Sequence, residues 1–170
     1  VEMQVDRDAL EYISALSQGL PHYTHLLGLY SAREAVDFGD MRVALRHVEA
    51  AITKAITKVQ QTIMSAYHKA TMSPRKESLF TQVLLACALA RSDDLGYFAA
   101  ADVREPMSLI MGRSYDIPTF SRHLNDFCEQ TRGPILQKTG YKHRFRFRFI
   151  NPLMQPFAIM QGLAAGLIDR

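Results

Sequence analysis

The chain has 170 residues, of which 48% are hydrophobic and 22% charged, so it can bury a core and is not a disordered tail. Its length allows one domain or two small ones. The net charge of +3 is unevenly spread: residues 1–70 carry seven Lys and Arg against eight Asp and Glu, whereas residues 71–170 carry thirteen against nine. We therefore expect any anionic partner to bind the C-terminal part.

The sequence also indicates the cellular compartment in which the protein is expected to reside. Cys87 and Cys128 lie within helical apolar patterns, which indicates buried free thiols in a reducing compartment. No apolar run approaches the roughly 18 residues of a membrane span, and no signal peptide is visible. These features predict a cytoplasmic protein that does not bind membranes. The chain opens at Val1 on an acidic helix start without an initiator Met, so we expect it to be part of something longer.

The first 70 residues predict a small all-helical domain. Helices are expected over residues 6–18 and 21–38, each ended by glycine. From residue 41 to 69 the apolar side chains repeat at intervals of three and four, which predicts one long helix. We expect this long helix to be the spine of a domain covering residues 1–70.

Residues 71–170 predict a second domain. The expected order is three helices, two strands joined in a hairpin, and a final helix, over residues 74–90, 102–111, 119–131, 135–138, 142–150 and 152–168. Asp93 and Asp94 follow the first of these helices and are typical of a turn. This order is that of a winged helix-turn-helix. The predicted fold class is therefore mainly α, a helical bundle followed by a winged helix-turn-helix with a small β-hairpin.

The second predicted strand alternates cationic and aromatic residues. On a strand, Phe145, Phe147 and Phe149 share one face and are expected to pack on a core. The arginines at 144, 146 and 148 share the other face, and no acidic residue occurs from 130 to 168. Such a strand suits the wing that a winged helix presents to nucleic acid. The alternative is an amphipathic strand whose arginines simply face solvent.

The third helix of the domain offers a second candidate contact. Arg122 and Asn125 face outward on it and can read base edges, as Arg does guanine and Asn adenine. Asp126 and Glu129 would repel phosphates, so either the helix approaches DNA by its N-terminus or it contacts protein. The predicted DNA-binding residues are Arg122, Asn125, Lys138, Lys142, Arg144, Arg146 and Arg148.

Two segments resemble known families. Residues 12–52, with Gly19-Leu20-Pro21-His22 at the start of the second helix, resemble the lid subdomain of AAA+ and STAND-type ATPases. The resemblance implies that His22 stands where a basic residue senses the γ-phosphate of ATP. Residues 78–150 resemble the winged-helix domain of origin-recognition-type initiator ATPases. The run Arg146-Phe147-Arg148-Phe149-Ile150-Asn151-Pro152-Leu153 is similar to the "RFxxP" ending of STAND wings.

The resemblance implies a lid-like bundle and a winged helix that together form the C-terminal regulatory region of an ATPase and bind duplex DNA. It implies the ATPase core and further copies of the protein as partners, with ATP and Mg²⁺ held in a preceding domain. No phosphate-binding loop, catalytic constellation or metal-ligand set occurs in the sequence, so we expect this segment not to be an enzyme. The alternative function is a winged-helix interaction module that regulates ATPase assembly or partner docking.

Overall fold

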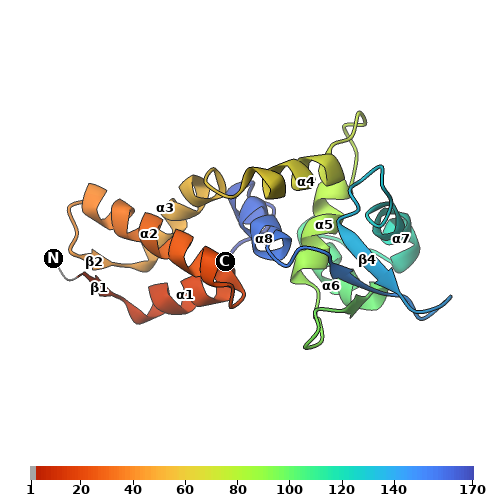
Figure 1. Cartoon of the computed structure of the whole chain (residues 1–170), viewed down its shortest axis with the longest axis horizontal. Helices are drawn as coiled ribbons and strands as arrows, with labels where there is room; N and C mark the ends of the chain where they lie inside the picture. The colour runs from red at the N-terminus through yellow and green to blue at the C-terminus, as the bar shows by residue number, and fades with distance from the viewer. Residues whose placement is uncertain (1–2) are drawn as a thin grey trace. The chain divides into compact units, whose positions relative to one another are not determined.

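The computed structural model describes residues 3–170, which form eight helices and five short strands (Figure 1). The predicted mainly α fold is confirmed. The chain divides into two compact units, unit 1 over residues 1–59 and unit 2 over residues 60–170. The division falls about ten residues before the expected boundary at 70.

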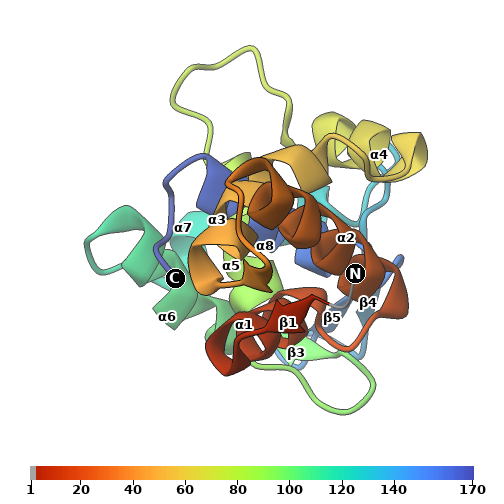
Figure 2. The same cartoon turned by 90° about the vertical axis from the view of Figure 1, so that its left-hand side faces the viewer.

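Unit 1 is a three-helix bundle with one small strand pair. Its elements are β1 (Gln4–Val5), α1 (Arg7–Ser17), α2 (Pro21–Asp37), β2 (Arg42–Val43) and α3 (Leu45–Ile56). The strands β1 and β2 pair in parallel, and the helices pack on one another (Figure 2). Apolar side chains recur at helical spacing in each helix, which buries Ile13, Leu27 and Val48 in the core. The sequence predicted α1 and α2 within a residue or two but missed both strands.

The expected single helix over residues 41–69 is wrong. The segment forms β2, then α3, then a break, and then α4 (Gln61–Thr71). At the break, the Thr57 hydroxyl donates to the carbonyl of Lys54 at 2.7 Å, a side-chain bond that competes with helix continuation. The apolar stripe stays in phase across the break, so its periodicity alone gave no sign of two helices. Val48 belongs to the core of unit 1, and Ile63 is buried in unit 2.

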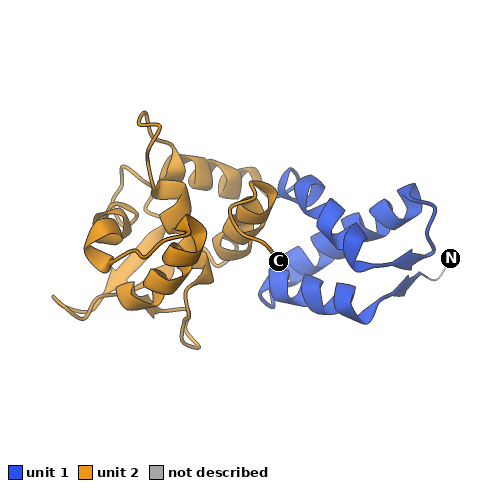
Figure 3. Ribbon diagram, turned by 180° about the vertical axis from the view of Figure 1, so that it is seen from behind, with its two compact units in different colours: residues 1–59 blue, residues 60–170 orange. Residues whose placement is uncertain are grey.

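Unit 2 combines helices with a small antiparallel sheet (orange in Figure 3). After α4 its elements are α5 (Phe80–Leu89), β3 (Phe98–Ala99), α6 (Ala100–Met111), α7 (Ile117–Asp126), β4 (Leu136–Thr139), β5 (Arg146–Phe149) and α8 (Met154–Ala164). The strand order is β3-β5-β4, with β5 antiparallel to both neighbours. The chain therefore runs helix, strand, helix, helix, hairpin, helix.

Two helix ends in unit 2 lie five or more residues from their predicted positions. A helix was expected to begin at Pro74, but α5 begins at Phe80 and residues 73–79 form a projecting loop (Figure 1). This polar stretch has no apolar face to bury, and packing decides where a helix begins more than capping residues do. The third helix ends at residue 126 rather than 131, because residues 127–132 form turns instead.

The final helix α8 packs closely against α5. A side-chain Cβ at Gly162 would lie 2.6 Å from a methyl carbon of Leu85, so any other residue there would require Leu85 to shift. Gly162 therefore permits the close packing of the two helices. Gly166 has open space around it and a φ of +68°, so it ends the helix.

Candidate nucleic-acid interface

A hairpin of β4 and β5 carries most of the predicted DNA-binding residues. Leu136 pairs with Phe149 and Thr139 with Arg146, and the loop of residues 140–145 joins the strands. The predicted strand over 142–150 is therefore correct only from 146 to 149, which places Lys142 and Arg144 in the loop. Gly140 holds the loop's tight conformation: its φ is +93°, and a Cβ there would lie 2.5 Å from the carbonyl oxygen of Arg144.

The aromatic face of β5 packs on the core, as predicted. Phe147 is 4% exposed, and Phe149 is half-buried. Both rings lie against Phe98 of β3, at centroid distances of 6.2 and 6.4 Å. This cluster fixes the orientation of the strand and so directs the intervening arginines to the opposite face. Phe145 precedes the strand and remains half-exposed in the loop.

An acidic side chain distant in sequence neutralises one of the arginines. The Arg146 Nη1 lies 3.0 Å from the Asp93 Oδ2, and its Nη2 donates to the carbonyl of Tyr97 at 3.0 Å. The expectation that no nearby acid offsets the arginine row is therefore wrong at Arg146. The sequence placed Asp93 in a turn, and this is correct: its Oδ1 accepts from the backbone N–H groups of Leu95 and Tyr97. The bond from the Tyr97 N–H leads the interactions that lower the pKa of Asp93.

The Arg148 side chain is also held by neighbouring residues. Its Nε donates to the Gln137 Oε1 at 2.9 Å, across the strand pair. Its guanidinium lies 4.8 Å from the centre of the Tyr97 ring, within cation–π range. Arg148 is half-buried by these contacts. Its guanidinium can reach a phosphate only by leaving these contacts.

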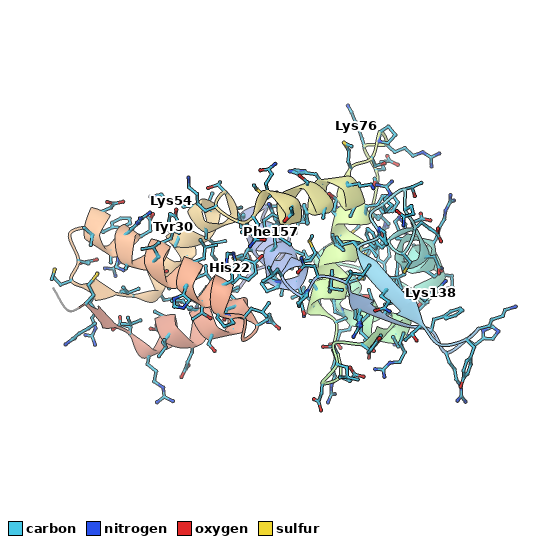
Figure 4. The ribbon with its side chains drawn as sticks, in the orientation of Figure 1. His22, Tyr30, Lys54, Lys76, Lys138 and Phe157 are labelled. Carbon is cyan, nitrogen blue, oxygen red and sulfur yellow. The ribbon has the colours of Figure 1, made fainter. Side chains whose placement is uncertain are left out.

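The side chains of Lys138 and Asn125 are hydrogen-bonded to each other. Lys138 of β4 (labelled in Figure 4) donates from Nζ to the Asn125 Oδ1 at 2.9 Å. The same Nζ lies 4.6 Å from the centre of the Phe145 ring. The Asn125 Nδ2 in turn donates to the carbonyl of Ser121 at 3.0 Å. These contacts tie the loop 140–145 to α7 and leave Asn125 with fewer free polar groups for a base edge.

Three of the predicted cations remain available. Lys142 and Arg144 are exposed in the loop, and among residues 3–170 no acidic side chain pairs with either. Arg122 on α7 is 89% exposed, with Asp126 at 3.9 Å as a solvent-screened partner. These three residues lie on the loop and on α7. Lys138, which bonds to Asn125 of α7, lies on β4, the strand that leads into the loop.

The candidate nucleotide sensor lies in unit 1. His22 is exposed in the first turn of α2 (Figure 4), and the exposed His25 follows one turn later. No acidic residue occurs in that turn, and no group of three metal-ligating side chains is found within residues 3–170. These residues by themselves do not fit a Mg²⁺–nucleotide complex. The sensing role of His22 stays a prediction.

The two cysteines are free, as the sequence indicated. Cys87 is buried in α5, and this burial raises the pKa of its thiol. Cys128 is half-buried, which raises its pKa to about 11. Thiols with raised pKa values are poor nucleophiles near neutral pH.

Within residues 3–170, no helix combines the length and the apolar character needed to cross a membrane.

Sequence reasoning missed the residues that restrain the arginines. Asp93 and Tyr97 lie about fifty positions before Arg146 and Arg148, and no local periodicity connects them. The available signal was the acid pair Asp93-Asp94 shortly before Tyr97, and turn chemistry already explained that pair.

Comparisons with known proteins give little beyond this geometry. No protein-family model and no curated protein matches the chain. Among solved structures, the chain is similar to Cdc6p from Pyrobaculum aerophilum, with 14% sequence identity and a TM-score of 0.35. The similarity covers 99% of this chain and 45% of that one, so the chain spans less than half the length of Cdc6p.

Proposed function

We propose that unit 2 is a winged helix-turn-helix that binds duplex DNA, within the C-terminal regulatory region of an AAA+ or STAND-type ATPase. Three helices are followed by a hairpin, and the short strand β3 between the first two helices adds to the sheet. In helix-turn-helix proteins a recognition helix enters the major groove. Here α7 is in the position of that helix, and the loop 140–145 is the tip of the wing.

The observation that carries the proposal is the unpaired charge on the wing tip. Lys142 and Arg144 project on a loop with no partner carboxylate in the described chain, next to a helix that exposes Arg122. Exposed cations of this kind bind phosphates and release condensed counterions, whatever the base sequence. We therefore propose weak binding without marked sequence preference.

A salt titration tests the proposal. Three phosphate contacts would give a slope of roughly −2.7 in a plot of log K against log salt. Changing Lys142 and Arg144 together to Gln should flatten that slope by roughly 1.8, because two contacts are lost. Binding of a duplex would be measured by fluorescence anisotropy at several salt concentrations.

The chain offers a matched control for this experiment. Arg75 and Lys76 are exposed on the projecting loop 73–79, and Lys76 lies well away from Lys138 (Figure 4). Their double change to Gln alters the net charge by the same amount but should leave the slope within error. If both double variants flatten the slope equally, general charge rather than the wing binds DNA. If the wild-type chain shows no salt-dependent binding at low salt, the proposal fails.

The second candidate function is a protein-interaction module. The C-terminal end of α7 favours it, since Asp126 lies there and the exposed Glu129 follows. These acids would repel a phosphate backbone that lay along the whole helix. In this case the Lys142 and Arg144 double variant should lose a protein partner, such as the ATPase core, and no duplex binding should be seen near physiological salt.

The link to an ATPase is proposed from the resemblance of the lid and wing segments. ATP and Mg²⁺ would bind in a preceding domain, because these residues provide no phosphate-binding loop. Calorimetry with Mg-ATP should therefore show no heat of binding to this chain. Micromolar affinity would contradict the assignment of residues 1–59 as a lid alone.

A further inference from the structure

A groove opens between the hairpin loop and the helices of unit 2. Its volume is about 580 Å³, within the range of small-molecule pockets. Residues of β3, α6, α7 and β5 form its walls, which are mostly apolar: Ala99, Ala100, Ala101, Ile117, Leu124 and Phe147. The loop residues His143, Arg144 and Phe145 form the remaining wall.

The wall formed by Phe145 is held in place before any ligand binds. The Lys138 ammonium lies 4.6 Å from the centre of the Phe145 ring and is hydrogen-bonded to Asn125 of α7. Gly140 fixes the loop from the other end. A pre-positioned aromatic ring costs little conformational entropy when a flat ligand stacks on it.

The charge around the groove selects an anionic ligand. Arg144 and Arg146 both line it, and none of the described lining residues is acidic. Arg146 is offset by Asp93, whereas Arg144 is unpaired. Two polar side chains, Ser121 and Asn125, also line the groove. The second hydrogen of the Asn125 amide remains available to a ligand acceptor, since only one bond from Nδ2 is used.

We infer that this groove binds one unpaired nucleobase of a DNA strand, stacked on Phe145, with Arg144 and Lys142 on the flanking phosphates. A nucleobase combines the required features: a flat face for the ring, polar edges for Ser121 and Asn125, and an anionic backbone on both sides. Aromatic stacking of this kind is sequence-tolerant because every base has a π-face. The inference rests on the proposed DNA binding and adds that the preferred site is a duplex with an unpaired base.

The test compares two DNAs with the full chain. One is a blunt duplex, and the other is the same duplex with one unpaired base, carrying 2-aminopurine at that position. Anisotropy gives the two affinities, and 2-aminopurine fluorescence reports stacking. Since base–aromatic stacking contributes about 1–3 kcal/mol, the wild type should prefer the unpaired site by roughly 5- to 150-fold.

Three variants locate the effect. Phe145→Ala and Phe145→Leu should both abolish the preference and the 2-aminopurine quenching, while blunt-duplex binding is retained. The leucine variant keeps an apolar side chain beside Lys138, so we expect it to fold. Thermal melting of each variant checks this. Tyr141→Ala is the matched control, because Tyr141 is an aromatic residue of the same loop, is 73% exposed and does not line the groove.

The outcomes separate this inference from the proposed function. Salt-dependent binding of both DNAs without a preference overturns the groove assignment and leaves the duplex proposal standing. A preference that survives in Phe145→Leu also overturns it. No binding of either DNA overturns both. Binding of an acidic peptide with one apolar side chain, lost in Phe145→Leu while DNA does not bind, would assign the groove to a protein partner instead.

Discussion

The carboxylate of Asp93 and the guanidinium of Arg146 form an ion pair, with Oδ2 and Nη1 3.0 Å apart. This contact joins the turn after α5 to β5 and offsets one of the three arginines of the alternating segment. The other carboxylate oxygen of Asp93 holds its own turn through two backbone N–H groups. Asp93 therefore both shapes the turn and limits the charge that the hairpin can offer to a polyanion.

Changing Asp93 to Asn should increase DNA binding. The Asn Oδ1 can still accept the backbone N–H groups, so the turn is kept, but the charge that pairs with Arg146 is removed. Arg146 would then be available to one more phosphate, and the salt slope should steepen by roughly 0.9. Anisotropy titrations at several salt concentrations measure this change.

Asp94→Asn is the control for this prediction. Asp94 is adjacent and exposed and has no ion-pair partner within the described residues, so its loss changes the net charge equally. We expect its slope to match the wild type. Equal effects of the two substitutions would show that the Asp93–Arg146 pair does not restrain Arg146.

The lowered pKa of Asp93, caused first by the Tyr97 N–H bond and less by Arg146, also predicts a dependence of stability on acid. Because the pKa of Asp93 is lowered in the folded state, its stabilising effect is present above the ordinary Asp pKa of about 3.9. That effect is lost as pH falls through the lower folded-state pKa. As the pH falls from 5 to values below the ordinary Asp pKa, the free energy of unfolding should therefore decrease more for the wild type than for Asp93→Asn. Urea unfolding at each pH measures this free energy. Parallel curves for the two proteins would contradict this.

Two helical glycines should respond oppositely to alanine. At Gly162 a Cβ would meet Leu85 at 2.6 Å, so alanine should lower the free energy of unfolding by about 1–3 kcal/mol through overpacking. At Gly28 of α2 nothing lies within 4 Å of the new Cβ, and alanine should stabilise by up to about 1 kcal/mol. Denaturant titrations of both variants measure the difference. A stable Gly162→Ala protein would mean that α5 and α8 pack less closely.

Arg132 should stabilise unit 2 without contributing to DNA binding. Its Nη1 donates to the carbonyl of Ala70 at 3.1 Å and also to that of Met72, and its guanidinium lies 3.6 Å over the Phe80 ring. Lysine cannot reproduce this fork and stacking, so Arg132→Lys should cost about 1.5 kcal/mol of stability. Arg91→Lys serves as the control, because Arg91 is exposed. A change in the salt slope for Arg132→Lys would place this residue at the interface instead.

The sequence by itself determined the local features of the chain. Helical periodicity located α1, α2, α6 and the centre of α8, and the alternation of Phe and Arg identified the strand that packs Phe147 on the core. Turns marked by glycine, asparagine or aspartate could also be predicted, as at Asp93. These features depend on residues within a few positions of one another, so propensity and spacing are enough to predict them.

Only the tertiary structure decided which cations are free and where a ligand fits. Arg146 is paired by an acid 53 positions away, and Lys138 turns toward Asn125 and Phe145 instead of joining the arginine row. The break between α3 and α4 could not be predicted either. The apolar residues keep their helical spacing across it, although those before the break pack in unit 1 and those after it pack in unit 2. In each case the deciding contact comes from another element of the fold, and its energy depends on three-dimensional packing that no local pattern records.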